Sequence, residues 1–142
     1  MVLRPRSAQL AGHGRGDRRR VPAVLGRHGQ GRCTPLHTHP SDASLYVVDG
    51  EILVHLDGQE HTLSASGLVI APLAVPHAFL VLSDTATMLT QHTPTTCQAF
   101  CFGASEPLTS DTDRVVDFDR VWASAITNGG IEILGPHPFP PV

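Results

Sequence analysis

Two histidines, His37 and His39, stand one residue apart in the stretch PLHTHPSDASLYVVDG. Side chains two positions apart on an extended chain point to the same face, so both imidazoles can approach one point. A third histidine, His77, follows Pro76 in APLAVPHAF, at the start of an expected strand. A divalent metal that keeps open coordination positions usually takes three protein ligands, and imidazole suits zinc, copper, iron and nickel. The pattern therefore predicts a metal site made of His37, His39 and His77.

A fourth histidine, His92, lies in MLTQHTP near the end of another expected strand. It is a candidate fourth ligand or a proton donor behind the ligands, and the alternative is a polar strand residue without such a role. The alternative for the whole set is a metal-free interior in which buried histidines hydrogen-bond to the protein. No catalytic residue is assigned, because the sequence holds no GxSxG motif and no helix-borne HExxH motif.

The remaining histidines and the cysteines show no comparable pattern. We expect His55 and His61 to face solvent. No chemical role is expected for the histidines in flexible or proline-bound segments, which are His13, His28 and His137. The thiols are predicted to be free in a reducing cytoplasm, with Cys97 and Cys101 as barrel or edge residues.

Short β-prone segments separated by turn residues fill the chain from Thr34 to about Cys101. The dipeptides DG at 49–50 and DG at 57–58 each stand between β-favouring runs, and they predict two tight hairpins. The later segments LVIAPLAV, HAFLVL and TATMLTQHT continue the pattern, with proline and Ser-Asp breaks between them. This rhythm of short strands and regular turns predicts an antiparallel sandwich or barrel.

One amphipathic helix is predicted in the C-terminal third, within RVVDFDRVWASAITNGG. Its apolar residues recur at helical spacing, and the Asn-Gly pair at 128–129 can end it. These apolar residues are Val115, Phe118, Trp122, Ala125 and Ile126. We expect the face with Phe118 and Trp122 to pack against the barrel, with Trp122 in the core. The tail IEILGPHPFPPV is expected to run extended under proline control.

Length and charge limit the class of protein. At 142 residues, the chain is long enough for one domain with a real core. No apolar run approaches the roughly 18 residues of a membrane span, and no signal peptide is recognisable, so we expect a cytoplasmic protein without a membrane partner. Eight arginines against Asp17 alone give the first 32 positions a formal charge of +7, and the rest of the chain carries −10. Because no aromatic residues are interleaved with these arginines, we expect residues 1–30 to be an irregular solvated segment and expect no nucleic-acid partner.

Together these segments resemble the cupin superfamily, most closely the small single-domain cupins similar to quercetin dioxygenases. The first cupin motif has a glycine, five residues, HxH, three or four residues, a glutamate, six residues and a glycine. Here it reads Gly31-RCTPL-His37-Thr38-His39-PSD-Ala43-SLYVVD-Gly50, which matches every spacing. The second motif resembles SGLVIAPLAVPH at 66–77, with Pro72 and His77 in register. This sequence departs from the family at Ser66-Gly67, where Gly-Asp is favoured, at Ala74, where Gly is favoured, and at Val81, where Asn is common.

The resemblance covers roughly residues 31 to 140 and implies an all-β fold, a cupin-type double-stranded β-helix (jelly-roll barrel) with one C-terminal helix. The expected organisation is an irregular segment at 1–30, the barrel at 31–110, and the helix and extended tail at 111–142. Ala43 occupies the position of the family's glutamate ligand, so the implied site keeps three histidines and lacks the carboxylate. Asp42 is adjacent, but neighbouring strand residues point to opposite faces.

Three functions follow from this resemblance. The first is a dioxygenase-like oxidoreductase that uses a divalent Fe, Mn, Ni, Co, Cu or Zn ion on an aromatic or enolic small molecule, in a pocket lined by Tyr46, Val48, Phe79 and Leu89. The second is a metal-assisted cyclase or isomerase that needs no oxygen. The third is a non-catalytic module that binds a small molecule. A homodimer is the expected assembly.

Overall fold

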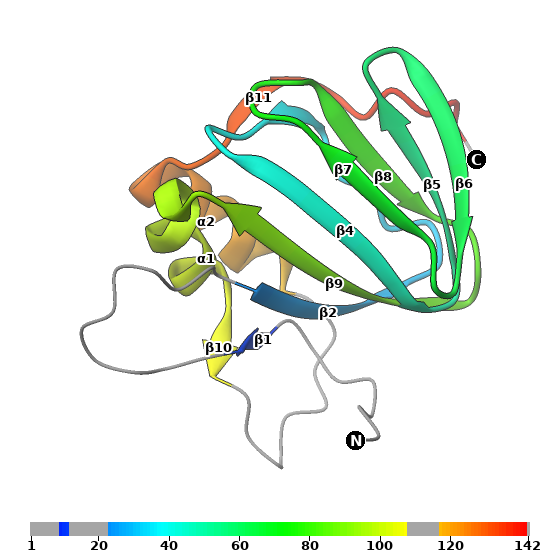
Figure 1. Ribbon diagram of the computed structural model, residues 1–142, viewed down its shortest axis with the longest axis horizontal. Helices are drawn as coiled ribbons and strands as arrows, with labels where there is room; N and C mark the ends of the chain where they lie inside the picture. The colour runs from blue at the N-terminus through cyan, green and yellow to red at the C-terminus, as the bar shows by residue number, and fades with distance from the viewer. Residues whose placement is uncertain (1–8, 12–22, 108–116, 142) are drawn as a thin grey trace.

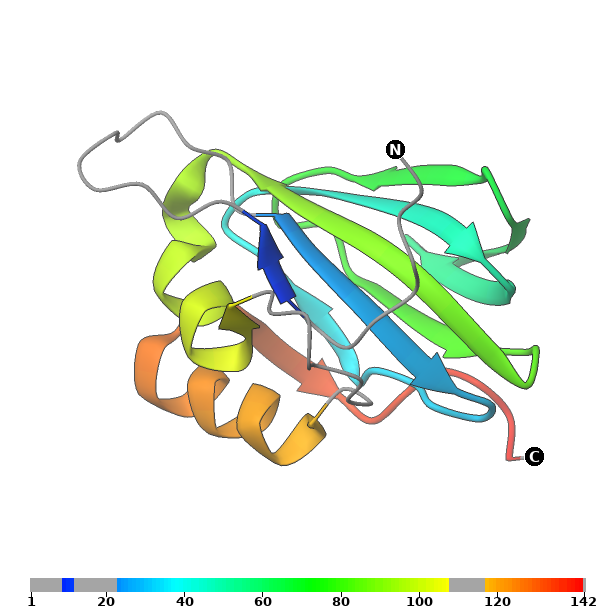
Figure 2. The ribbon, with the colours of Figure 1, turned by 90° about the horizontal axis from the view of Figure 1, so that it is seen from below.

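The computed structural model describes residues 9–11, 23–107 and 117–141. Two β-sheets face each other, and the helices lie together at one end of them (Figure 1, Figure 2). The six-stranded sheet runs β10 (Glu106–Pro107), β1 (Gln9–Ala11), β2 (Ala23–Gly29), β9 (Thr85–Thr93), β4 (Asp42–Asp49) and β7 (Leu68–Ala71). The five-stranded sheet runs β11 (Glu132–Gly135), β3 (Leu36–Thr38), β8 (His77–Val81), β5 (Glu51–Leu56) and β6 (Gln59–Ser64). The strand pairs are antiparallel apart from β1 with β10, which confirms the predicted all-β class.

The core lies between the two sheets because each strand places alternate side chains on its inner face. Three buried residues of the six-stranded sheet, Val47, Ala86 and Met88, pack against three of the other sheet, which are Ile52, Val54 and Val81. Burial of such side chains stabilises the fold by about 1.5–3 kcal/mol for each large aliphatic residue.

The two DG dipeptides form different turns. Asp57 and Gly58 have φ angles of 49° and 80°, and they join β5 to β6 as a two-residue hairpin, as predicted. The prediction of a hairpin at Asp49-Gly50 is wrong, because β4 pairs with β7 and β9 whereas β5 pairs with β6 and β8. The chain instead crosses there from one sheet to the other. At Gly50, with φ of 89°, an added Cβ would collide with the carbonyl oxygen of Thr85, so the corner needs glycine.

At some of the positions where this sequence departs from the second motif, the backbone keeps the left-handed conformation that glycine favours. Ser66 and Ala74, which stand at or beside positions where the family favours glycine, both have positive φ angles, 72° and 61°. The chain therefore adopts a left-handed conformation there at the cost of some strain. The amide of Ala74 donates to the carbonyl oxygen of His39 (3.0 Å), so this strained turn also holds the backbone of a candidate ligand.

Two helices close one end of the barrel. The predicted helix is α2 (Phe118–Asn128), with Asp117 accepting a hydrogen bond from the Arg120 amide and Gly129 at its C-cap. Val115 lies outside the described residues. Neither η1 (Thr95–Cys97) nor α1 (Gln98–Ala104) was expected from the sequence, and the assignment of Cys97 and Cys101 to strands or edges is wrong. Both thiols are free and buried.

The N-terminal end of the chain differs from expectation, because the segment 1–30 contains both β1 and β2. Strand β2 begins at Ala23, within the segment 1–30 that was expected to be irregular, and pairs with β9 along its whole length. Of the tail, β11 joins β3, and Phe139 is buried against Ala78 and Leu80 on the outer face of the five-stranded sheet. None of the helices in the described ranges is long and apolar enough to cross a membrane.

Candidate metal centre

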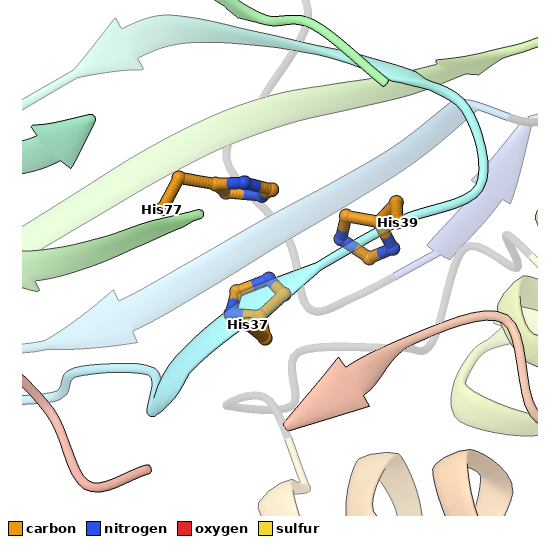
Figure 3. Close-up of side chains that lie close together, drawn as sticks. All are labelled: His37, His39 and His77. Atoms are coloured by element: carbon orange, nitrogen blue, oxygen red, sulfur yellow. The ribbon is translucent and has the colours of Figure 1, made fainter. Parts of the chain in front are cut away.

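Three histidines from adjoining strands lie around one point (Figure 3). His37 is in β3, His39 follows the end of β3, and His77 begins β8 directly opposite His37. One nitrogen from each ring lies within 4.8 Å of the others. The ring centroids are 4.4 Å apart for His37 and His77, 4.9 Å for His37 and His39, and 5.2 Å for His39 and His77. The structure thus brings together the three residues that the sequence pattern selected.

Each of the three rings is anchored by a backbone carbonyl. The Nδ1 atoms of His37 and His77 donate to the carbonyl oxygens two residues earlier, those of Pro35 (2.8 Å) and Val75 (2.9 Å). His39 Nδ1 donates to the carbonyl oxygen of Gly130 (2.9 Å), which follows α2. Because a carbonyl oxygen can only accept, Nδ1 carries the proton in all three rings. The three Nε2 atoms therefore keep free lone pairs, which is the arrangement that metal-binding histidines require.

Burial keeps the cluster uncharged. Desolvation, with the neighbouring histidines adding to it, lowers the pKa of His37 to about 4 and that of His39 to about 2. Desolvation also lowers the pKa of His77, against the hydrogen bond to Val75, which favours the charged form. A histidine must be neutral to bind a metal, so these rings are available as ligands at neutral pH.

His92 stands beside the position of the missing carboxylate. It faces Ala43 across the β4–β9 ladder, and its ring centroid lies 4.4 Å from that of His39. Burial lowers the pKa of His92 to about 4. Asp42 is exposed and accepts a hydrogen bond from the amide of Leu73 (2.8 Å), so its carboxylate points away from the cluster.

A second set of donors overlaps the first. His39, His92 and Cys97 also offer one ligand atom each within 4.8 Å of one another. The Cys97 thiol donates to the carbonyl oxygen of Gly130 (3.2 Å), the same atom that accepts from His39. The Ser41 hydroxyl lies 3.1 Å from Cys97 Sγ and 3.4 Å from His92 Nδ1. Nothing in the sequence placed Cys97 here, because its position depends on how α1 packs on the barrel.

Two cavities meet at the histidines. The outer cavity, of about 190 Å³, is bounded by the barrel and by both helices, and it is lined by His37, His39, His92, His28 and mostly apolar side chains. The inner cavity, of about 80 Å³, is lined by the same His37 and His39, by His77 and by Ala43. No carboxylate lines either cavity within the described residues.

Of the four residues predicted to line the pocket, the structure places one, Phe79, in the lining. Tyr46 is 37% exposed and lies on the outer face of β4, because the inward positions of β4 are 43, 45 and 47. Val48 lies at the irregularity between Val47 and Asp49 and lines neither cavity. Leu89 is paired with Tyr46 and lies on the same outer side of the sheet. A shift of one residue in the strand register exchanges the two faces, which is why the sequence selected outward-facing residues.

Sequence reasoning also misjudged His28 and Trp122. His28, which was expected to lie in a flexible segment, is buried and lines the outer cavity. Trp122, which was expected in the core, is 51% exposed and also contributes to the lining of the outer cavity. Among β2 residues, the lining holds Val24, Gly26 and His28, whose alternate spacing is the one signal in the sequence that could have found His28.

The donor set fits a divalent transition metal. Three neutral imidazoles with oriented Nε2 atoms, a sheltered location and an adjoining cavity are the features of a site with open coordination positions. His92 lies close enough to His39 to serve as a fourth ligand or as a neighbouring proton carrier.

Comparison with known proteins agrees with this geometry. The family described as the cupin domain matches residues 28–91. The fold is that of a cupin. The protein TT1209 from Thermus thermophilus superposes with a TM-score of 0.53 at 21% identity, over 61% of this chain and 82% of that one. KdgF from Halomonas sp. gives 0.52 at 24% identity, over 60% and 76%.

A mutant form of salicylate 1,2-dioxygenase from Pseudoaminobacter salicylatoxidans gives a TM-score of 0.51 at 21% identity, over 55% of this chain and 24% of that chain. Other solved structures are matched over 37% to 66% of their own length, so this chain spans less than two thirds of them. No curated protein matches the sequence. The family match over residues 28–91 supports the cupin superfamily, and the likenesses to solved structures show the fold. The expected kinship with quercetin dioxygenases stays a prediction.

Proposed function

We propose that this cupin is a metal-dependent, dioxygenase-like oxidoreductase that acts on an aromatic or enolic small molecule. The observation that carries the proposal is the set of three histidines, His37, His39 and His77, whose Nδ1 atoms are all committed to backbone carbonyls. This arrangement orients three Nε2 lone pairs within a site that borders an apolar cavity. A structural role alone would not need three clustered rings held in one tautomer.

The chain's own residues would divide the work. The Nε2 atoms of His37, His39 and His77 would hold the ion, which when bound orients a substrate oxygen and lowers its pKa. The apolar lining of the outer cavity excludes water from the substrate. His92, whose Nδ1 lies 3.4 Å from the Ser41 hydroxyl, would hold the proton that a carboxylate at position 43 would otherwise accept.

Metal analysis of the purified protein tests the proposal. We expect about one equivalent of a divalent transition metal in the wild type and a loss of most of it in His37→Ala and His77→Ala, because each variant removes one of three ligands. His61→Ala is the matched control, since His61 is exposed on β6. Equal metal content in all four proteins would refute the metal site. Oxygen uptake with mono- and polycyclic phenols then tests the oxidative chemistry.

A metal-assisted cyclase or isomerase is the second candidate. The absence of a carboxylate from both cavities, within the described part of the chain, favours it over the dioxygenase, because the resemblance assigns proton abstraction in the dioxygenase reaction to the carboxylate that Ala43 replaces. Turnover that continues without oxygen would establish this candidate and exclude the first. Ligand affinity that survives His37→Ala, with no turnover of any kind, would instead establish the non-catalytic binding module.

A further inference from the structure

His28 is a buried polar side chain that the proposed metal site does not use. It lies on β2, 8% exposed, and its Nδ1 atom is buried without a hydrogen-bond partner among the described residues. Its side chain faces the outer cavity from the same side of β2 as Val24 and Gly26. A buried ring nitrogen without a partner costs free energy, and a ligand group in the cavity that hydrogen-bonds to the His28 ring would offset that cost.

The side chains around His28 are aromatic, and two of them also line the outer cavity. Phe79 and Phe118 contact the imidazole edge-on, with centroids 5.2 Å and 5.9 Å away. Desolvation, assisted by the nearby positive charge of Arg32, lowers the pKa of His28 to about 4, so the ring is neutral at pH 7. A neutral imidazole carries one donor and one acceptor and matches a hydroxyl or carbonyl group rather than a carboxylate.

The size of the outer cavity limits the ligand. A cavity of roughly 150 Å³ accommodates benzene, and the outer cavity is about 190 Å³. It therefore suits one substituted ring better than the three rings of a flavonol. Along β9, the partner of His28 is Ala86 and the partner of Ala43 is His92, so His28 and the metal centre border the cavity at different ends.

We propose that His28 is the polar recognition group of the outer cavity, and that the cavity takes an uncharged single-ring compound whose hydroxyl or carbonyl group hydrogen-bonds to His28. Only the statement that this ligand is a substrate rests on the proposed function. Binding itself requires the cavity and His28 and does not require the metal.

Three probes of matched shape test the inference: p-cresol, p-xylene and p-toluate. Calorimetry gives their affinities, and the emission of Trp122, the single tryptophan of the chain and a residue of the cavity lining, reports occupancy. We expect p-cresol to bind roughly 3- to 10-fold more tightly than p-xylene, the gain of one hydrogen bond. We expect p-toluate to bind least tightly.

Variants of His28 test whether the preference for p-cresol over p-xylene depends on this residue. His28→Phe should abolish the preference for p-cresol, and His28→Gln, which keeps a hydrogen-bonding side chain, should restore part of it. His55→Phe is the control, because His55 also has a buried unpartnered Nδ1 but lines neither cavity. Melting curves establish which variants are folded. A preference that keeps its full wild-type value in folded His28→Phe would overturn the inference, and if that variant does not fold, the full value in His28→Gln would do so.

The variant His77→Ala separates the two proposals, because His77 is a predicted ligand that does not line the outer cavity. We expect it to lose metal and to keep the preference for p-cresol. A preference that disappears in His77→Ala and persists in His28→Phe would locate the hydroxyl at the metal and overturn the inference. Absence of binding by all three probes to the wild type, or tighter binding of p-toluate, would overturn it as well. Failure of metal binding alone would refute only the proposed function.

Discussion

At the scale of single residues, the candidate metal centre has an alanine, Ala43, at the position where the resemblance implies a glutamate ligand. Ala43 is buried and faces the inner cavity, and His92 lies across the ladder from it. The described residues around the cluster therefore hold imidazoles and a thiol in place of any negative charge. A bound divalent ion would keep its full positive charge, which strengthens its pull on a substrate oxygen.

Restoring the carboxylate tests this interpretation. In Ala43→Glu, we expect the metal-free protein to melt at a lower temperature, because a buried carboxylate without a cation is costly. We expect metal affinity to rise about tenfold or more, because the carboxylate adds a charged ligand. Calorimetric metal titration and melting curves with and without metal measure both effects.

Ala43→Gln is the control for this experiment, since it has nearly the same size without the charge. Equal responses of the Glu and Gln variants to metal would show that position 43 does not reach the ion. The inner cavity beside Ala43 provides space for either side chain.

At the scale of elements, the residue that follows the end of α2 is hydrogen-bonded to the candidate metal centre. The carbonyl of Gly130 anchors both His39 and Cys97, although it lies 91 residues from His39 in the chain. Gly130 has a φ of 81°, and an added Cβ would lie 2.8 Å from the Cβ of Phe100. The helices are locked together nearby, since Ser124 donates to the carbonyl oxygen of Phe100 (2.8 Å).

Gly130→Ala should therefore weaken metal binding without changing any ligand. The clash moves the carbonyl that orients His39, and loss of such an outer contact typically lowers metal affinity about 10- to 100-fold. Metal titration measures the change. Gly129→Ala is the matched control, because Gly129 also has a positive φ (65°) but its added Cβ meets nothing within 4 Å. The same loss of affinity in both variants would attribute the effect to backbone strain rather than to the carbonyl.

At the scale of the whole molecule, five histidines held away from solvent make the fold sensitive to acid. They are His28, His37, His39, His77 and His92, and burial lowers the pKa of every one from 6.5. Below pH 6.5 these histidines are protonated in the unfolded chain and remain neutral in the folded chain. The free energy of unfolding therefore falls as the pH falls. The loss continues until the pH reaches the folded-state values, which are about 4 for His28, His37 and His92.

Denaturant unfolding of the metal-free protein between about pH 7.5 and pH 5 measures this loss. For each histidine that stays neutral in the folded state, we expect a slope that is small at pH 7.5 and approaches about 1.4 kcal/mol per pH unit below pH 6.5, where the unfolded chain is protonated. His28→Phe should reduce the slope of the free energy of unfolding against pH by the contribution of one histidine. His61→Ala, at an exposed position, should leave the slope unchanged. A midpoint that does not move with pH would mean that the histidines are not buried as the structure has them.

An exposed apolar surface on β4 and β7 is relevant to the expected homodimer. Tyr46, Leu68, Ile70 and Leu73 are exposed apolar residues on or next to β4 and the edge strand β7. A stripe of this kind is typical of contact surfaces. The homodimer expected from the sequence stays a prediction.

The sequence alone determined what local chemistry can encode. Alternating apolar residues indicated the strands, helical spacing indicated α2, and the HxH pair with the Pro-His pair selected His37, His39 and His77, because these signals depend only on neighbours along the chain. Tertiary structure decided which sheet each strand joined and which face turned inward. For this reason Tyr46 and Val48 lie outside the pocket, the chain crosses between the sheets at Asp49-Gly50, and His28 lines the outer cavity. Tertiary structure alone placed the Gly130 carbonyl and the Cys97 thiol behind His39, because contacts between segments far apart in sequence leave no periodic trace in either.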